Sequence, residues 1–262
     1  MAPYISLKDQ REVFSIHAPD IREQRSISAI LGALDDKIEL NCQTNETLEA
    51  LARAIFKDWF VDFGPTRAKA EGRAPYLEPA LWDLFPDRLD AEGKPEGWEP
   101  RRVDDLIELV YGKSLPAKKR VPGRYAVYGS GGIAGYHSQA LITCPSIIIG
   151  RKGTVGSLYW EDEPCFPIDT VFYVKSTLPL TFCFYLLQTL GLENMNTDAA
   201  VPGLNRNNVY RLSRPWPGEA LVHTFDEQVG LLRRRIRSNA EESRTLTQTR
   251  DLLLPKLMSG EI

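Results

Sequence analysis

The fold of this chain is decided by Ile21–Phe63, which reads IREQRSISAILGALDDKIELNCQTNETLEALARAIFKDWFVDF and is patterned as one long helix. Mainly apolar residues recur in it at alternating steps of four and three, at Ile27, Leu31, Leu34, Ile38, Asn41, Asn45, Leu48, Ala52, Ile55 and Trp59. A repeat of this kind, held over about four heptads, is typical of a helix that packs along a second helix. The two asparagines at its middle favour one register and one partner, at some cost in stability.

A second stretch carries the same seam 198 positions later in the chain. Its matching residues are Val229, Leu232, Ile236, Asn239, Ser243, Leu246, Arg250, Leu253 and Leu257. If the two helices pair antiparallel, Asn41 comes near Ser243. The same pairing brings Asn45 near Asn239. A single amphipathic helix more often simply covers a core, but a duplicated register with the same polar interruption favours two helices that pair with each other.

Size and composition indicate a globular protein with more than one part. The chain has 262 residues, which exceeds one average domain. Apolar content of 43% and charged content of 26% are ordinary for such a protein. No apolar run reaches the roughly 18 residues that a membrane span requires, and the first residues, MAPYISLKDQRE, lack the pattern of a secretion signal. We therefore expect a cytoplasmic protein.

One segment of the sequence lacks acidic residues altogether. Between Glu108 and Glu161 there is no Asp or Glu, and seven cations are present: Lys113, Lys118, Lys119, Arg120, Arg124, Arg151 and Lys152. Because the net charge is −3, the rest of the chain sums to −10. A run of charge is often only a solvated face. A window without acids favours a surface that binds a polyanion, because each cation can neutralise a phosphate and release counterions.

Two loops could present polar side chains to DNA. Ile149–Gly156 places two cations between glycines after an apolar strand, and Arg can bind guanine with two hydrogen bonds. A tight β-hairpin with exposed basic residues explains the same pattern. Pro202–Asn208 is rich in Asn, which can pair with an adenine edge but is also common in turns.

The residue types that carry catalysis form no recognisable constellation. The four cysteines lack a C-x-x-C pair and the three histidines lack metal-ligand spacing, so reduced thiols and no metal site are expected. Gly129–Ala134 fits a dinucleotide pattern, but no acid follows at the required distance, and a flexible turn with amides near phosphate is favoured. Asp169 with Lys175 lacks the second carboxylate of a metal-dependent nuclease, and we interpret Asp169 as a structural acid.

The order of the parts follows from these patterns. Residues 1–20 match the segment 198 positions later and are interpreted as the end of a preceding head-like unit. A first helix is predicted over residues 21–63, with Gly64-Pro65 as its breaker, and a connector over residues 64–97 that packs through Trp82 and Phe85. Short strands between Gly and Pro turns predict an α/β (α+β) head over residues 98–217. The second helix is predicted over residues 218–262.

This order of parts, and several phrases within it, resemble the specificity subunit of type I restriction–modification systems. The phrases are LEALARAIFKDWFVDFGP (48–65), LFPD (84–87), PEGWE (95–99), YGSGGIAG (128–135), IGRKGTVG (149–156), IDT (168–170), VPGLN (201–205) and LLPKLMSGEI (253–262). The resemblance implies one globular target recognition domain plus two long antiparallel coiled-coil spacer helices. It also implies a chain that binds double-stranded DNA without catalysing a reaction.

The partners and cofactors also follow from the resemblance. They are methyltransferase subunits and an endonuclease/translocase subunit, in a phage-defence complex directed to a bipartite target. S-adenosylmethionine, ATP and Mg would belong to those partners, so none is bound by this chain. From charge and loop position, the DNA-binding residues are expected to be Lys113, Ser114, Lys118, Lys119, Arg120, Ser130, Arg151, Lys152, Thr154, Asn205 and Arg206.

The chain departs from the family pattern in one respect. A typical member has two recognition domains, whereas here the first is reduced to residues 1–20. A half-subunit that forms a homodimer and a fragment of a disrupted gene both fit this pattern. Two other functions stay open: a scaffold or decayed fragment that pairs only through its helices, and an enzyme that uses Asp169.

Overall fold

The computed structural model describes residues 19–196 and 203–259, which fall into two compact units. The first unit comprises residues 1–50 and 232–262, and the second comprises residues 51–231. Most of the predicted remnant at residues 1–20, the VP of VPGLN and the last three residues lie outside the described residues. Among the described residues, no helix combines the length and the apolar content needed to cross a bilayer.

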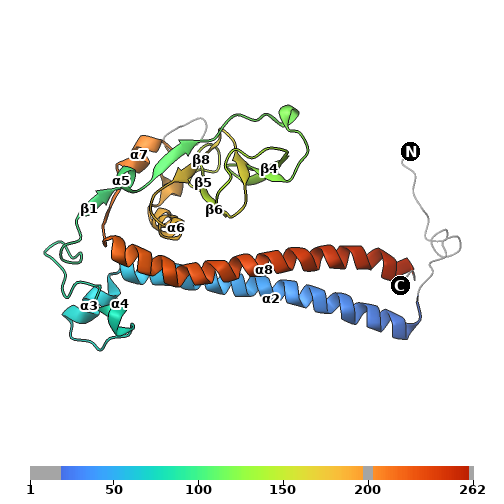
Figure 1. Ribbon diagram of the computed structural model, residues 1–262, viewed down its shortest axis with the longest axis horizontal. Helices are drawn as coiled ribbons and strands as arrows, with labels where there is room; N and C mark the ends of the chain where they lie inside the picture. Colours follow the sequence, from blue (N-terminus) through green and yellow to red (C-terminus); the bar gives the residue numbers. More distant parts are fainter. Residues whose placement is uncertain (1–18, 197–202, 260–262) are drawn as a thin grey trace. The chain divides into compact units, whose positions relative to one another are not determined.

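The first unit is a pair of antiparallel helices, as predicted. Helix α2 (Ile21–Phe60) and helix α8 (Glu219–Ser259) contribute most of their length to it (Figure 1). Asp20 caps α2, because its carboxylate accepts hydrogen bonds from the backbone N–H groups of Arg22 and Glu23, at 2.8 and 2.9 Å. Every predicted seam residue in this unit is buried or half-buried, whereas the solvent-facing positions of the two helices are exposed.

The polar layer lies in the middle of the helix pair. Asn41 is 2% exposed, and its side-chain N–H group donates to Ser243 Oγ at 3.2 Å and to Glu242 Oε2 at 2.9 Å. Asn239 is 1% exposed and donates to Asn45 Oδ1 at 2.8 Å. These bonds form only in one register, because a shift of one residue would leave buried amides without partners.

Ion pairs flank the polar layer on both sides. Arg233 lies 3.0 Å from Glu49, with both side chains largely buried, and Arg250 lies 2.7 Å from Asp35. The second pair accounts for an arginine at a seam position of α8. Its aliphatic stem covers the seam while its guanidinium reaches a carboxylate on α2.

The described residues of the second unit form three sheets. The four-stranded sheet has the order β2-β8-β5-β6, with all neighbours antiparallel, and consists of β2 (Glu108–Tyr111), β8 (Val171–Lys175), β5 (Ser146–Gly150) and β6 (Leu158–Glu161). The three-stranded sheet has the order β4-β3-β7 and consists of β4 (Gly132–His137), β3 (Tyr125–Gly129) and β7 (Cys165–Pro167). Strand β3 pairs antiparallel with β4 and parallel with β7. A small sheet pairs β1 (Pro100–Arg102) with β9 (Ser213–Pro215).

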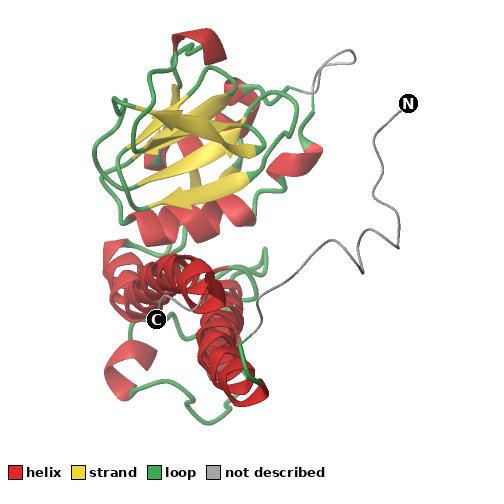
Figure 2. Ribbon diagram, turned by 90° about the vertical axis from the view of Figure 1, so that its right-hand side faces the viewer, coloured by secondary structure: helices red, strands yellow, loops and turns green. Residues whose placement is uncertain are grey.

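Short helices complete the second unit. They are α3 (Gly64–Ala70), α4 (Pro79–Trp82), α5 (Val103–Leu106), η1 (Ala117–Lys119), α6 (Leu180–Gln188), η2 (Leu192–Asn194) and α7 (Arg206–Tyr210). Figure 2 shows the strands gathered in one part of the molecule. Helix α6 packs against β5 and β6, where Phe184 meets Trp160 edge-on at 5.5 Å between ring centroids. Between the two larger sheets, the buried side chains of Tyr128, Ile148 and Val171 form a core.

An aromatic cluster joins the long helices to the head within the second unit. Phe225 of α8 lies 5.4 Å from both Phe56 and Phe60 of α2, and 6.4 Å from Phe182 of α6, measured between ring centroids. Trp98, at the start of the head, lies 6.2 Å from Phe60. Such edge-on and tilted pairs add to the free energy gained by burying the rings.

Two parts of the second unit differ from the sequence expectation. Gly129–Ala134 was expected to be a flexible turn, but only Ser130 and Gly131 turn, and β4 follows them. Pairing with β3 overrides the weak strand preference of glycine. The connector begins with helix α3 at the predicted breaker, because Pro65 lies in the first turn, where a missing N–H group costs nothing.

Loss of the Asn239 side chain is expected to destabilise the helix pair. Asn239→Ala leaves the buried oxygen of Asn45 without its donor, which should lower the free energy of unfolding by about 1–3 kcal/mol. Denaturant unfolding followed by helical circular dichroism measures this. Ser238→Ala, at an exposed neighbouring position, should change the value by no more than about 0.5 kcal/mol. Equal effects of the two variants would contradict the role of the polar layer.

Removal of the Phe225 ring is expected to lower the free energy of unfolding more than loss of the Asn239 side chain does. Phe225 is 0% exposed, so Phe225→Ala should lower the free energy of unfolding by about 3–5 kcal/mol. Leu231→Ala, on the same helix and 60% exposed, is the control and should stay within about 0.5 kcal/mol. A loss in Phe225→Ala no larger than that of the control would show that the cluster does not hold the unit together.

Candidate nucleic-acid interface

The loop between β5 and β6 carries three of the predicted contact residues. Arg151 and Lys152 both donate their backbone N–H groups to the carbonyl oxygen of Thr170, at 2.9 and 3.1 Å. Gly153 and Gly156 have φ of +85° and +74°, which other residues rarely adopt. The loop thus joins two antiparallel strands, and it also exposes the side chains of Lys152 and Thr154. The hairpin interpretation of the sequence therefore holds here, and the contact of this loop with DNA stays a prediction.

Arg151 and Arg206 lie against the same aromatic ring. The guanidinium carbon of Arg151 is 5.4 Å from the ring centroid of Tyr111, and that of Arg206 is 5.0 Å from it. Each arginine is also fixed by a backbone carbonyl: Arg151 Nη2 donates to Asp169 O at 2.6 Å. Arg206 Nη1 donates to Leu109 O at 3.4 Å. Asp169 thus supports the basic loop through its backbone.

A polar cavity of about 260 Å³ lies at this cluster. It is lined by Tyr111, Arg151, Asn205, Arg206 and Asn207, among others. Asn205 begins α7, and its side-chain oxygen accepts the backbone N–H of Asn207 at 2.9 Å. That oxygen therefore already has a donor, which leaves the amide N–H group of Asn205 as its group for a ligand.

The remaining predicted cations lie before β3. Lys113, Ser114, Lys118 and Lys119 are exposed. Arg120 is half-buried, because its Nη1 donates to the carbonyl oxygen of Ala134 on β4 at 2.6 Å. This bond fastens the segment that carries the lysines to the edge of the three-stranded sheet.

Unlike the exposed lysines, Ser130 is buried. It is 6% exposed, and its hydroxyl donates to Thr170 O while accepting from the backbone N–H of Lys152. The carbonyl oxygen of Ser130 accepts from the hydroxyls of Ser157 and Tyr159. Its polar atoms are therefore used inside the fold, and the structure removes Ser130 from the candidate surface. Its role is to tie the β3–β4 hairpin to the basic loop.

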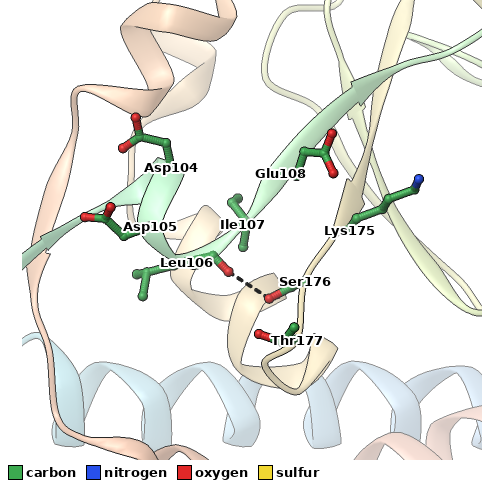
Figure 3. A pocket seen from close by; sticks show the side chains of 8 residues that line it. All are labelled: Asp104, Asp105, Leu106, Ile107, Glu108, Lys175, Ser176 and Thr177. Carbon is green, nitrogen blue, oxygen red and sulfur yellow. Dashed lines mark hydrogen bonds between the residues drawn. The ribbon is translucent and has the colours of Figure 1, made fainter.

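A second hollow, of about 360 Å³, has the opposite charge (Figure 3). It is lined by Asp104, Asp105 and Glu108, with Lys175 beside them, and Ser176 donates to Leu106 O at 2.7 Å. The hydrogen bonds from Arg102 hold the pKa of the Asp104 carboxyl below its usual value, so it stays ionised. Three carboxylates repel a phosphodiester, which excludes this hollow from the candidate DNA surface.

Tyr111 is the residue that sequence reasoning missed. It is 48% exposed at the end of β2, and its ring also meets Phe172 at 4.9 Å between centroids. Its position inside the acid-free window was the available signal. Nothing in the sequence brings Arg206 next to it, because that contact joins residues 95 positions apart.

Most of the head matches a known family of protein domains. Residues 95–209 match the family described as the type I restriction modification DNA specificity domain. The matched segment, which is less than half of the chain, is similar to that domain. The match spans the basic loop, Tyr111 and Arg206, so the polar cavity lies inside the matched segment.

Similarity extends beyond the domain to nearly the whole chain. The HindI type I specificity subunit of Haemophilus influenzae is 28% identical, over 97% of this chain and 70% of that protein. The MjaIX type I specificity subunit of Methanocaldococcus jannaschii is 25% identical, over 93% of this chain and 60% of that protein. Relatives of this kind are specificity subunits and not catalytic subunits, in agreement with the sequence expectation.

A solved structure shares the fold. The S subunit of the type I restriction–modification system from M. genitalium superposes with a TM-score of 0.61 and 19% identity. The match covers 91% of this chain and 61% of that one. The chain thus spans about 60–70% of the length of the relatives compared here. Among the described residues, no cluster of His, Cys, Asp and Glu has the geometry of a metal site.

The cysteines divide into two classes, which a thiol reagent should separate. Burial raises the pKa of Cys165 to about 12 and that of Cys183 to about 11, so both stay protonated near pH 8. Cys42 and Cys144 are exposed. We expect two thiols to react with Ellman's reagent in the native protein and four after denaturation. Four fast thiols in the native protein would contradict the burial of Cys165 and Cys183.

Proposed function

We propose that this chain is the sequence-reading subunit of a type I restriction–modification complex and binds double-stranded DNA through its specificity domain. The observation that carries this proposal is the polar cavity at which Tyr111 and Arg151, from the acid-free window of the sequence, meet Arg206. Cations that are fixed in place and form no ion pair with a described carboxylate attract a duplex strongly, and polar side chains beside them can read base edges.

The assembly proposed for the chain follows from its two units. The paired helices hold the specificity domain and contact methyltransferase subunits, and an endonuclease/translocase subunit joins that complex. In this proposal S-adenosylmethionine, ATP and Mg²⁺ are bound by those partners and not by this chain. The complex acts in the cytoplasm against invading DNA.

The proposed target is bipartite. The family match covers a single specificity domain, at residues 95–209. A second copy of the chain would supply a second domain, and a two-fold axis would make the two half-sites identical. Mapping methylated bases in a host that carries the complex tests this: a palindromic bipartite motif supports the pair of copies, and an asymmetric motif contradicts it.

Selection from a random duplex library tests the reading of DNA. The full chain, with its methyltransferase subunit, is mixed with the library, and the bound duplexes are sequenced. Enrichment of one motif supports the proposal, and the absence of any enrichment would overturn it. A chain that assembles with the methyltransferase subunit but enriches no motif would instead be the scaffold that the sequence left open as an alternative. Arg151→Ala with Lys152→Ala should cause loss of duplex binding while assembly with the methyltransferase subunit persists.

The exposed lysines should supply affinity without selectivity. Lys118→Ala with Lys119→Ala is expected to weaken binding to all duplexes alike, and each lost phosphate contact should reduce the slope of log K against log salt by about 0.9. Fluorescence anisotropy over a salt series measures this slope. Lys175→Ala is the control, because that lysine lies beside carboxylates, and it should leave the slope unchanged. A change in motif in the double variant would show that these lysines read bases instead.

A further inference from the structure

The two arginines of the polar cavity are held in place before any ligand arrives. One nitrogen of each guanidinium donates to a backbone carbonyl, of Asp169 for Arg151 and of Leu109 for Arg206. Both guanidiniums lie over the Tyr111 ring, at 5.4 and 5.0 Å from its centroid. Arg151 lies in addition 5.8 Å from the centroid of Phe172. Side chains fixed in this way lose little conformational entropy on binding.

The two positive charges are close together and are not neutralised within the described residues. Neither Arg151 nor Arg206 forms an ion pair with a described carboxylate. The Nε atoms of both arginines are buried and lack a hydrogen-bond partner among the described atoms. Because a ligand cannot reach a buried Nε atom, the terminal nitrogens of the two guanidiniums, which line the polar cavity, are the donors that an acceptor can approach.

We infer that Arg151, Tyr111 and Arg206 form one clamp that binds a single backbone phosphate of the DNA; this rests on the proposed function. A neutral base edge is satisfied by one arginine with two hydrogen bonds, and a second cation beside it adds little. A phosphodiester is an anion with several acceptor oxygens, so it gains from both guanidiniums at once. The clamp fixes the position of the domain on the duplex, and other side chains then read the bases.

Salt dependence distinguishes one shared phosphate from two separate ones. The full chain is titrated onto a short duplex of random sequence by fluorescence anisotropy, between about 50 and 200 mM salt. Arg151→Ala and Arg206→Ala should each weaken binding roughly tenfold at the low-salt end. If they hold one phosphate, the double variant loses only about 0.9 from the slope of log K against log salt. Two independent contacts would remove about twice that value.

Two variants of Tyr111 test the contribution of its ring to the clamp. Tyr111→Phe keeps the ring and removes the hydroxyl, and it should bind the duplex as the wild type does. Tyr111→Leu removes the ring that both guanidiniums cover, and it should weaken binding roughly fivefold. Circular dichroism melting of each variant checks that the fold is kept.

Arg101→Ala is the matched control. Arg101 also stacks on an aromatic ring, at 4.7 Å from the centroid of Trp216, but it lies on β1 and does not line the polar cavity. The variant removes the same charge and the same kind of stacking, and it should leave both affinity and slope unchanged. Equal losses in Arg101→Ala and Arg206→Ala would overturn the clamp, because they would reflect net charge alone.

The remaining outcomes separate the clamp from the proposed function. A wild-type chain that binds no duplex refutes the proposed function and removes the ligand of the clamp with it. A wild-type chain that binds, with variants that bind equally well, refutes the clamp alone. A selected motif that relaxes at one base pair in Arg206→Ala, with the slope unchanged, would show that this arginine reads a base, and it too would refute the clamp.

Discussion

The contact between Phe225 and the rings of Phe56 and Phe60 is the interaction on which the second unit depends. It fixes the end of α2 against the start of α8, and through Phe182 it fixes both helices against α6 of the head. A seam of leucines would hold two helices together but would not choose where a sheet attaches. Large rings that meet edge-on permit fewer arrangements than aliphatic side chains do, so the cluster determines the orientation of the head relative to these helix ends within the unit.

The head carries a cluster of cations and a cluster of carboxylates at two different hollows. The cavity of Arg151 and Arg206 and the hollow of Asp104 and Glu108 lie in the same unit but carry opposite charge. A duplex is attracted by the first and repelled by the second, so the cavity of Arg151 and Arg206 is the favoured place for it to bind. The family match covers the residues of the basic cavity. Backbone carbonyls, and not carboxylates, fix its arginines, which leaves their charge available.

The long helices could be predicted from the sequence, because their apolar residues repeat with the helical period, and short strands of the head could be predicted from the Gly and Pro turns that bound them. Strand β4 could not, since its glycines favour a turn and its partner β3 decides its conformation. The same distinction holds at the site. The cations of the acid-free window could be identified from the composition of the sequence. The burial of Ser130 and the stacking of Arg206 on Tyr111 were not, because each depends on residues that only the fold brings together.

The beginning of α2 and the end of α8 lie next to each other, since Pro19, Arg22 and Leu257 line one hollow of the first unit. A short link from Ser259 to Pro19 would therefore close the described chain into a ring at a small entropic cost. New termini could then be opened at the exposed turn around Gly93, whose φ is +80°. Circularly permuted versions of this kind should assemble the same helix pair, because the seam contacts do not depend on where the chain is opened.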